Sequence, residues 1–257
     1  MIKAAFFDVD GTLVSHKTKS VPQSARDALE KLRASGVKCI VATGRHLREM
    51  QRLPVKDLPF DGYITLNGQL ILDENREMLH GVPITGRARE ILLRMFEARE
   101  LPLLLIAEDA NYLNFVDDRV RTVHQAISTP IPPLVPYEGQ TLYQACAYLE
   151  EAEEHLLRAL EGECLITRWG FGGVDIVAKG GGKAAGIRRY LEHNGMKTSE
   201  IIAFGDAQND LDMLELAAIG VAMGNAAEEV KQAADYVTAD IDDDGIARAL
   251  KHFGLIE

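Results

Sequence analysis

Two aspartates near the start of the chain have the residue type and spacing of a catalytic or metal-binding pair. Asp8 and Asp10 follow an apolar run, Ala4–Phe7, whose length and composition are those of a buried strand. A carboxylate inside such a strand would be costly unless it were paired or bound to a metal, so we expect both at the strand's carboxyl end, where a sheet opens to ligand. Because side chains alternate along a strand, the two carboxylates face the same side. The pattern predicts a two-carboxylate site.

Two other interpretations of this pair must be weighed. A strand that ends in an acidic turn would look the same, since a glycine such as Gly11 after Asp10 is ordinary turn chemistry. A calcium loop of the EF-hand type does not fit, because Thr12 follows Gly11 without the third acidic or amide ligand. The function of the pair therefore depends on which other polar residues the fold brings to it.

Two further apolar strands, at residues 37–42 and 201–204, also end in polar residues. These are Thr43, Gly44 and Arg45 after the first of them, and Asp206, Asn209 and Asp210 after the second. Between the strand that precedes Asp8 and the strand at 37–42, apolar residues recur at the spacing of a helix. These three elements form a strand, helix, strand unit, whose two strands run parallel. The carboxyl ends of parallel strands meet at one edge of a sheet, so four carboxylates and a hydroxyl should converge there.

Carboxylates gathered in this way would raise one another's pKa unless a cation joined them. Hard oxygen ligands in that number favour Mg2+, which takes one or two carboxylates, keeps several waters and commonly bridges to a phosphate. Lys183 adds a positive charge at a helix start, directly after three glycines whose backbone N–H groups suit an anion. A P-loop does not fit, because Val177 stands where its first glycine is required and Ala184 stands where Ser or Thr should follow the lysine.

The order of elements changes in the middle of the chain. The expected helices there span residues 85–100, 117–127 and 150–161, and the expected strands span 103–107, 143–149, 164–167 and 174–178. Regular alternation then resumes, with helices at 183–193, 211–216, 226–234 and 246–253, and strands at 201–204, 219–222 and 236–237. We therefore expect an α+β domain at 83–178, inserted into an α/β domain with a parallel sheet at 1–82 and 179–257. Asn67-Gly68 predicts a hairpin between strands 62–66 and 69–72.

Composition and charge exclude several classes of protein. The chain has 257 residues, 47% hydrophobic and 26% charged, as in soluble globular proteins. Its 28 Lys and Arg against 39 Asp and Glu give a net charge of −11, which disfavours nucleic acid and anionic membranes as partners. Cys39, Cys146 and Cys164 are odd in number and lie in apolar stretches, and no apolar run is long enough for a bilayer. We expect a cytoplasmic protein.

The four motifs, in this order, resemble those of the haloacid dehalogenase superfamily. Residues 8–12 match its first motif, residues 43–45 the second, Lys183 the third and residues 205–210 the fourth, so that the resemblance covers the whole chain. The chain is most similar to the Cof-type sugar-phosphate phosphatases, whose large C2 cap (type IIB) lies between the second and third motifs. The resemblance implies a Rossmann-like parallel-sheet core with an inserted α+β cap that would close over the substrate.

The resemblance also implies a function, which is a Mg2+-dependent phosphatase for small phosphorylated metabolites, with sugar or polyol phosphates as the expected class. Asp8 would be the nucleophile that forms an aspartyl-phosphate, and Asp10 the general acid and base. The metal would be held by the Asp8 carboxylate, the Asp10 main-chain carbonyl and Asp206, with Asp210 ligating it or ordering its waters. The phosphoryl oxygens would be bound by Thr43, Gly44, Arg45, Lys183 and Asn209.

Some assignments stay open at this point. Arg45 could contact substrate or be a surface residue at a helix start, and Lys179 competes with Lys183 for the third motif. A phosphomutase and a non-catalytic sugar-phosphate-binding protein remain alternatives, and the protein could be a monomer or a homodimer.

Other features are expected to be structural. The acidic segment at residues 240–245 fits the first six places of a calcium loop, but Lys251 stands where the loop needs a glutamate. His124 and His155 lie in amphipathic helices, where a histidine is usually packed or solvated. Four aromatic residues of the inserted domain could face a sugar, although core packing is the more common role. They are Tyr112, Phe115, Trp169 and Phe171.

Overall fold

The computed structural model describes residues 1–127, 129–169 and 172–257, which form two compact units. The core unit consists of Met1–His80 and Gly182–Glu257, and the inserted unit consists of Gly81–Gly181. Within the described part of the chain, every helix is too short or too polar to span a bilayer.

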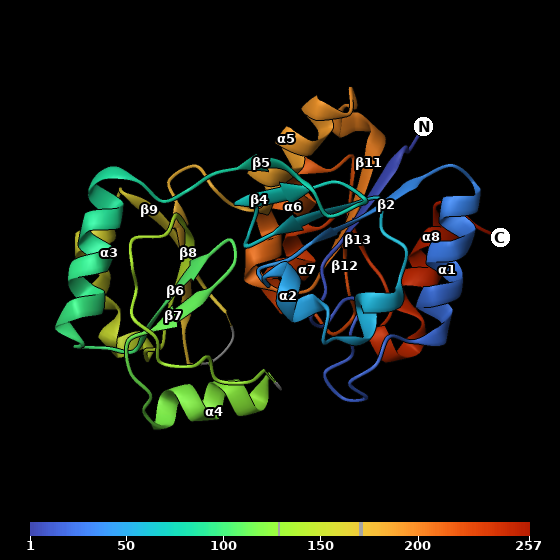
Figure 1. The fold of residues 1–257 in the computed structure, drawn as a ribbon. Coiled ribbons are helices and arrows are strands. Elements are labelled where there is room, and N and C mark those ends of the chain that lie inside the picture. The colour runs from blue at the N-terminus through green and yellow to red at the C-terminus, as the bar shows by residue number, and fades with distance from the viewer. Residues whose placement is uncertain (128, 170–171) are drawn as a thin grey trace. The chain divides into compact units, whose positions relative to one another are not determined.

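The core unit is built on an eight-stranded sheet in the order β13-β12-β11-β1-β2-β3-β4-β5 (Figure 1). Its strands are β1 (Ala4–Phe7), β2 (Lys38–Ala42), β3 (Gly62–Thr65), β4 (Leu70–Leu72), β5 (Met78–Gly81), β11 (Ile201–Gly205), β12 (Ile219–Ala222) and β13 (Tyr236–Val237). The strands from β13 to β3 run parallel, and β4 is antiparallel to β3. Because β1 lies between β2 and β11, the three strands that carry the predicted site are neighbours. This confirms the expected α/β core.

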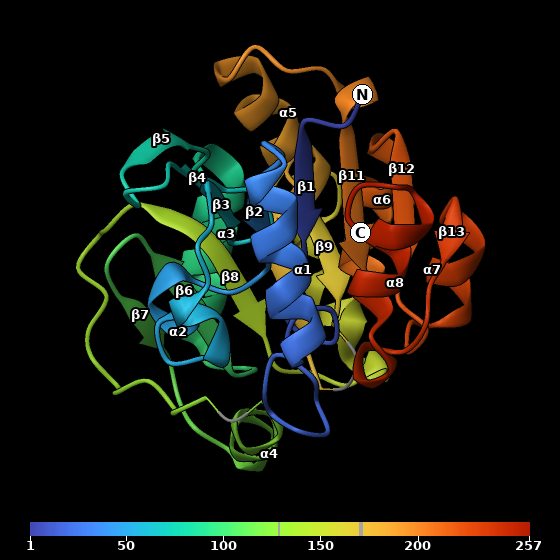
Figure 2. The same cartoon turned by 90° about the vertical axis from the view of Figure 1, so that its right-hand side faces the viewer.

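Alternation along β1 explains how the sheet is covered on both faces. Ala5 and Phe7 belong to the apolar cluster under α1 and α8, whereas Ala4 and Phe6 belong to the cluster under α5, α6 and α7 (Figures 1 and 2). The helices are α1 (Gln23–Ala34), α5 (Lys183–His193), α6 (Leu211–Leu216), α7 (Glu228–Ala233) and α8 (Gly245–His252). Shorter turns of helix are α2 (Leu47–Met50), η1 (Pro54–Asp57), η3 (Thr198–Glu200), η4 (Gln208–Asp210) and η5 (Ile241–Asp243). A strand buried on both faces must be apolar throughout, as β1 is.

The hairpin predicted at Asn67-Gly68 is present, but its loop is longer than two residues. Thr65 pairs with Leu70, so residues 66–69 form the loop. Leu66, Asn67 and Gly68 all have positive φ angles, of 52°, 50° and 86°. The loop therefore curls through three left-handed residues in succession.

The inserted unit contains an antiparallel five-stranded sheet in the order β7-β6-β8-β10-β9 (Figure 1). Its elements are α3 (Gly86–Ala98), β6 (Leu103–Ala107), β7 (Asn111–Leu113), α4 (Asp118–Ala126), β8 (Leu142–Ala147), η2 (Glu151–Leu160), β9 (Cys164–Arg168) and β10 (Val174–Ala178). Apolar residues of α3 and η2 pack with the strands into one core. The unit is α+β as expected, but the predicted α-helix at 150–161 is a 3-10 helix, and β7 was not predicted, nor was β5 of the core sheet.

The two histidines of the inserted unit have the structural roles expected of them. His124 is 5% exposed, with Nε2 2.9 Å from the Tyr148 hydroxyl and Nδ1 3.1 Å from the Thr129 carbonyl oxygen. His155 is exposed, and its Nδ1 lies 2.9 Å from the carbonyl oxygen of Ala152.

The aromatic residues considered for a sugar face are mostly packed on other side chains. Tyr112 lies edge-on to Tyr137, Trp169 lies edge-on to Tyr148, and the guanidinium of Arg99 lies over the Phe115 ring. Phe171 lies outside the described residues. The acidic segment at 240–245 contains η5 and leads into α8, and the Asp240 side chain accepts a hydrogen bond from the backbone N–H of Asp242.

Candidate active site

Asp8 and Lys183 form the centre of the candidate site. Asp8 follows β1, is 5% exposed, and its backbone N–H donates to the Phe204 carbonyl of β11 at 3.0 Å. Lys183 is the first residue of α5, and its Nζ donates to Asp8 Oδ1 at 2.6 Å and to Asp210 Oδ1 at 2.5 Å. Lys183 and Asp210 are fully buried, whereas Lys179 is exposed. The structure thus brings the lysine at the helix start against the first aspartate.

Asp206 is held beside this pair by the loop that follows β1. Thr12 Oγ1 donates to Asp206 Oδ1 at 2.9 Å. Gly11 has a φ of +85°, and a Cβ at that position would lie 2.2 Å from Asp206 Oδ2. Glycine is required there on both counts, since other residues rarely adopt that φ and none would leave room for the carboxylate.

Asp210 serves as an anchor for the loop after β11. Its Oδ2 accepts the backbone N–H groups of Asp206, at 2.9 Å, and Ala207, at 3.0 Å, while its Oδ1 binds Lys183. This arrangement fixes the turn that presents Asp206. It also explains the glycine before Asp206, because a Cβ on Gly205 would lie 2.5 Å from the Asp210 Cβ.

Three of these carboxylates could hold a metal ion together. Oxygens of Asp8, Asp206 and Asp210 all lie within 4.8 Å of one another, and no other such group of three acidic, histidine or cysteine side chains occurs among the described residues. The Asp10 carboxylate is not in this group. The contribution of the Asp10 main-chain carbonyl to a metal and the use of its carboxylate for proton transfer stay predictions.

The Asp10 carboxylate is instead bound by Arg45. The guanidinium forms a two-point contact, with Nε 2.5 Å from Asp10 Oδ2 and Nη2 2.8 Å from Oδ1. The Arg45 side chain is 12% exposed, and its Nη1 lies 3.8 Å from a Glu49 oxygen. Arg45 is therefore not a surface residue at a helix start, which was one of the two roles left open for it. Geometry of this kind is the strongest that arginine makes with a carboxylate.

The remaining predicted residues lie on loops of the same sheet edge. Thr43 is 1% exposed, and its Oγ1 accepts the backbone N–H of Arg45 at 3.2 Å, across the half-buried Gly44. Asn209 donates its Nδ2 to Asn67 Oδ1 at 3.1 Å. Asn67 was predicted as a turn residue, in an Asn-Gly pair that proteins of the resembled family usually carry at this place, and it was not among the predicted site residues.

Burial and mutual repulsion shape the charges of the site. Burial, with Asp210 and Asp10 nearby, raises the pKa of Asp8 to about 7, although Lys183 acts in the opposite direction. Burial, together with Asp8 and Asp210, raises the pKa of Asp206 to about 8. Burial acts to lower the pKa of Lys183, but Asp210 and Asp8 outweigh it and raise that pKa above its usual range.

A divalent cation fits this set of groups. The four carboxylates, Asp8, Asp10, Asp206 and Asp210, against the cations of Lys183 and Arg45 leave a formal charge of −2 when all are ionised. A doubly charged ion would neutralise that excess and lower the raised pKa values of Asp8 and Asp206. The donors are carboxylate oxygens, which suit Mg2+.

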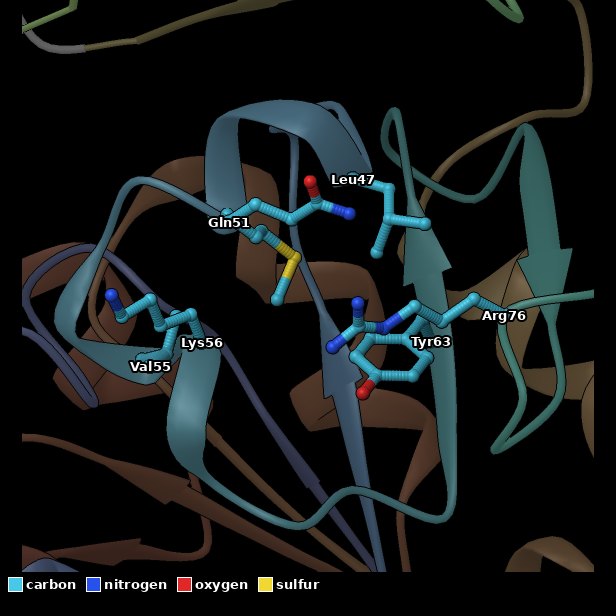
Figure 3. A pocket seen from close by; sticks show the side chains of 7 residues that line it. Leu47, Gln51, Val55, Lys56, Tyr63 and Arg76 are labelled. Atoms are coloured by element: carbon cyan, nitrogen blue, oxygen red, sulfur yellow. The ribbon is translucent and has the colours of Figure 1, made fainter.

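Two hollows elsewhere do not contain the candidate residues. The hollow in Figure 3 holds about 10 Å³, roughly one water molecule, beneath α2 and η1 in the core unit. A second hollow, of about 470 Å³, lies in the inserted unit, and its two lining arginines, Arg119 and Arg168, are already paired with Glu153 and Glu154. Neither hollow offers an unpaired cluster of catalytic groups among the described residues.

Comparison with known proteins agrees with this geometry. The sequence pattern of the haloacid dehalogenase-like hydrolases matches residues 5–250. YkrA of Bacillus subtilis (strain 168) is 33% identical over 258 residues, covering 99% of each chain. A phosphatase of the superfamily from Bacteroides thetaiotaomicron has a TM-score of 0.91 at 35% identity, covering 100% of this chain and 96% of its own. A subclass IIB sugar phosphatase has a TM-score of 0.88 at 37% identity, covering 99% and 100%. The chain therefore belongs to the haloacid dehalogenase-like hydrolase family.

Proposed function

We propose that the protein is a Mg2+-dependent phosphatase that hydrolyses small phosphorylated metabolites, with sugar or polyol phosphates as the substrate class. One observation carries the proposal, which is the buried Lys183 between Asp8 and Asp210, with Asp206 beside them. The full-length similarity to a sugar phosphatase supports the substrate class. We propose the phosphorylated metabolite as the partner that the protein binds. We also propose that the protein is a monomer or a homodimer and that it is located in the cytoplasm.

Asp8, Asp206 and Asp210 would hold the metal, together with the main-chain carbonyl of Asp10. When bound, Mg2+ would neutralise negative charge on the phosphoryl group and on the carboxylates around it. Lys183 supplies part of the same neutralisation permanently, because it is fully buried against Asp8.

Asp8 is assigned as the nucleophile. A carboxylate oxygen of Asp8 forms a bond to phosphorus while the bond from phosphorus to the substrate alcohol oxygen breaks, which leaves an aspartyl-phosphate. Asp8 must be ionised for this step. The positive charge of Lys183 favours that form and opposes the effect of burial on the pKa of Asp8.

Asp10 is assigned as the general acid and base. It gives its proton to the departing alcohol oxygen, and it then takes a proton from the water that attacks the aspartyl-phosphate, which releases phosphate and restores Asp8. Arg45 binds both oxygens of the Asp10 carboxylate and so holds the carboxylate in one orientation.

The other predicted residues are assigned to the oxygens of the transferring phosphoryl group. Thr43 offers a hydroxyl and Gly44 a backbone N–H in the loop after β2, and Asn209 offers an amide in η4, which follows β11. Phosphoryl transfer requires mainly alignment and charge stabilisation of this kind.

The test is phosphate release from a panel of sugar and polyol phosphates, with and without Mg2+, by the wild type and by Asp8→Asn. We expect Mg2+-dependent release that falls by at least about a thousandfold in Asp8→Asn, because the amide cannot act as the nucleophile. Asp61→Asn is the matched control, since Asp61 pairs with Arg33 away from the site, and it should retain turnover. Near-normal release by Asp8→Asn would refute the mechanism. Phosphate transfer to a sugar that depends on a sugar bisphosphate would instead identify a mutase, and binding without turnover would identify a sensor.

A further inference from the structure

The loop between β3 and β4 is bonded to three of the four motifs through one residue. The backbone N–H of Asn67 donates to the Thr43 carbonyl at 3.0 Å, and its carbonyl accepts the N–H of Gly182 at 3.1 Å. Its side-chain Oδ1 accepts from Asn209 Nδ2 at 3.1 Å. Asn67 is 4% exposed, so these bonds form away from bulk water. A single residue thus contacts the loops that carry the second, third and fourth motifs.

The backbone around Asn67 adopts a conformation that ordinary turns avoid. Leu66, Asn67 and Gly68 all lie in the left-handed region, which is strained for a residue such as leucine. A Cβ on Gly68 would lie 2.1 Å from the Gly182 carbonyl oxygen. The fully buried Gln69 also donates its Nε2 to the Asn67 carbonyl, at 3.3 Å. The loop therefore packs closely against the start of α5, where Lys183 is the first residue.

The contact with Asn209 limits the orientations that its amide can take. One N–H of the Asn209 amide is directed at Asn67, and because the amide is planar, this restricts the directions that its carbonyl oxygen and its second N–H can take. A group that binds a transferring phosphoryl oxygen must be oriented before the reaction, since reorganisation during the reaction raises the barrier.

We infer that Asn67 is a positioning residue for the phosphate-binding groups. Its side chain orients the Asn209 amide, and its backbone sets the spacing between the loop of Thr43 and the start of α5. The inference rests on the proposed function, in which Asn209 binds the phosphoryl group.

The substitution Asn67→Gly separates the two contributions of this residue. Glycine tolerates the positive φ and can keep both backbone hydrogen bonds, and it removes the side-chain amide, including the oxygen that accepts from Asn209. We expect a fall of about tenfold in kcat/KM, the effect of one lost hydrogen bond to an oriented group. Asn75→Gly is the control, because Asn75 is an exposed turn residue of the same unit, and it should match the wild type.

A double-variant cycle shows whether Asn67 acts through Asn209. Asn209→Ala alone should lower kcat/KM by about tenfold, and the double variant should be no worse, since the Asn67 side chain has no amide left to orient once Asn209 is alanine. A double variant that is about a hundredfold slower would show independent effects and would overturn the inference.

A readout without turnover comes from the side-chain amide of Asn209 in nitrogen-15 NMR spectra, identified by its absence in Asn209→Ala. This resonance should move in Asn67→Gly and stay in place in Asn75→Gly. An unmoved resonance in Asn67→Gly would also overturn the inference. If the wild type released no phosphate, the proposed function would fail, and the NMR result would still decide whether Asn67 holds the amide.

Discussion

Two ion-pair clusters in the core unit differ in how they are buried. Lys183 lies between Asp8 and Asp210, and the three side chains are at most 8% exposed. Arg33 forms a two-point pair with Asp61, at 2.9 and 3.0 Å, with 35% and 23% of the side chains exposed. Both clusters join segments far apart in the chain. Only the first removes an unbalanced set of charges from water.

The difference indicates which cluster stabilises the fold and which destabilises it. Burial of several like charges costs free energy that one cation does not fully return, and the raised pKa of Asp8 reflects that cost. For Asp61, burial acts to raise the pKa but is outweighed by the bonds from Arg33 and from the Cys39 N–H, so that its pKa is lowered. We therefore regard Arg33 and Asp61 as part of the scaffold, and the Lys183 cluster as a site kept at the expense of stability.

The largest effect should follow from removing the buried cation. Lys183→Met leaves two buried carboxylates without their partner, which should lower the free energy of unfolding by about 3–5 kcal/mol at pH 7 and abolish turnover. Arg33→Met should cost only about 0.5–1 kcal/mol, because its pair is partly exposed. Urea unfolding of both variants measures the comparison. Equal losses of stability would show that the two clusters do not differ as argued.

Two glycines allow the effect of a close contact with Asp206 to be separated from the effect of backbone strain. Gly11 and Gly36 have similar φ angles, of 85° and 88°, but a Cβ on Gly36 would meet nothing within 4 Å. Each change to alanine should cost roughly 1–2 kcal/mol in backbone strain. Gly11→Ala should also displace Asp206 and lose Mg2+-dependent turnover, whereas Gly36→Ala should keep it. Full activity in Gly11→Ala would contradict the role of the close contact.

The metal should restore the stability that the carboxylate cluster removes. The pKa values of Asp8 and Asp206 are raised to about 7 and 8, so the metal-free folded protein holds protons that the unfolded chain releases. Its stability should therefore fall as the pH rises from about 4 to about 8. Mg2+ competes with these protons, so its stabilisation should grow with pH, to about 2.7 kcal/mol at a hundredfold excess over Kd.

Melting temperatures with Mg2+ and with a chelator, at pH 5.5 and 8.5, measure this effect. Asp206→Asn, which removes one ligand charge, should lose most of the increment. An increment equal at both pH values would argue against a site at these carboxylates.

The smallest effect is the pH dependence of stability that comes from the pair of Arg33 and Asp61. Its sign is opposite to that of the carboxylate cluster. Because the pKa of Asp61 is lowered on folding, its contribution is present above the unfolded value of about 4 and is lost as the pH falls through the folded value. Asp61→Asn should therefore be about 1 kcal/mol less stable than the wild type at pH 6, and the difference should shrink as the pH falls below about 4. Acid titration of unfolding by circular dichroism gives the difference. A gap that widened in acid would reverse the assignment.

The helices and strands that have a clear local pattern of apolar residues were predicted correctly from the sequence. The helix expected at 183–193 is α5, Lys183–His193, and the apolar runs that end in polar residues are strands β1, β2 and β11. The segment predicted as an α-helix at 150–161 is a 3-10 helix, because apolar spacing does not distinguish bonds to the third residue from bonds to the fourth. β7 has only three residues, and β5 is largely exposed, so neither shows a buried alternating pattern.

The candidate site was predictable to the extent that strand ends converge. Asp8, Asp206, Asp210 and Lys183 meet because each lies at the end of a strand or the start of a helix on one sheet edge. The pairing of Arg45 with Asp10 depends on side-chain directions across 35 positions, which no local pattern encodes. Asn67 looked like a hairpin residue because its bonds to Gly182 and Asn209 exist only in the folded chain.

The central position of β1 has a consequence for the order of folding. Ala4 pairs with Lys38 on one side and with Ile201 on the other, and the whole inserted unit lies between these partners in the chain. Chains emerge from the ribosome with the N-terminus first, and domains generally fold as units. The inserted unit is continuous and is complete before β11 is made, so we expect it to fold while β1 still has one unpaired edge. A nascent chain that has reached residue 181 would hold Asp8 and Thr43 but neither Lys183 nor Asp206, so catalytic competence would be acquired only with the last sheet strands.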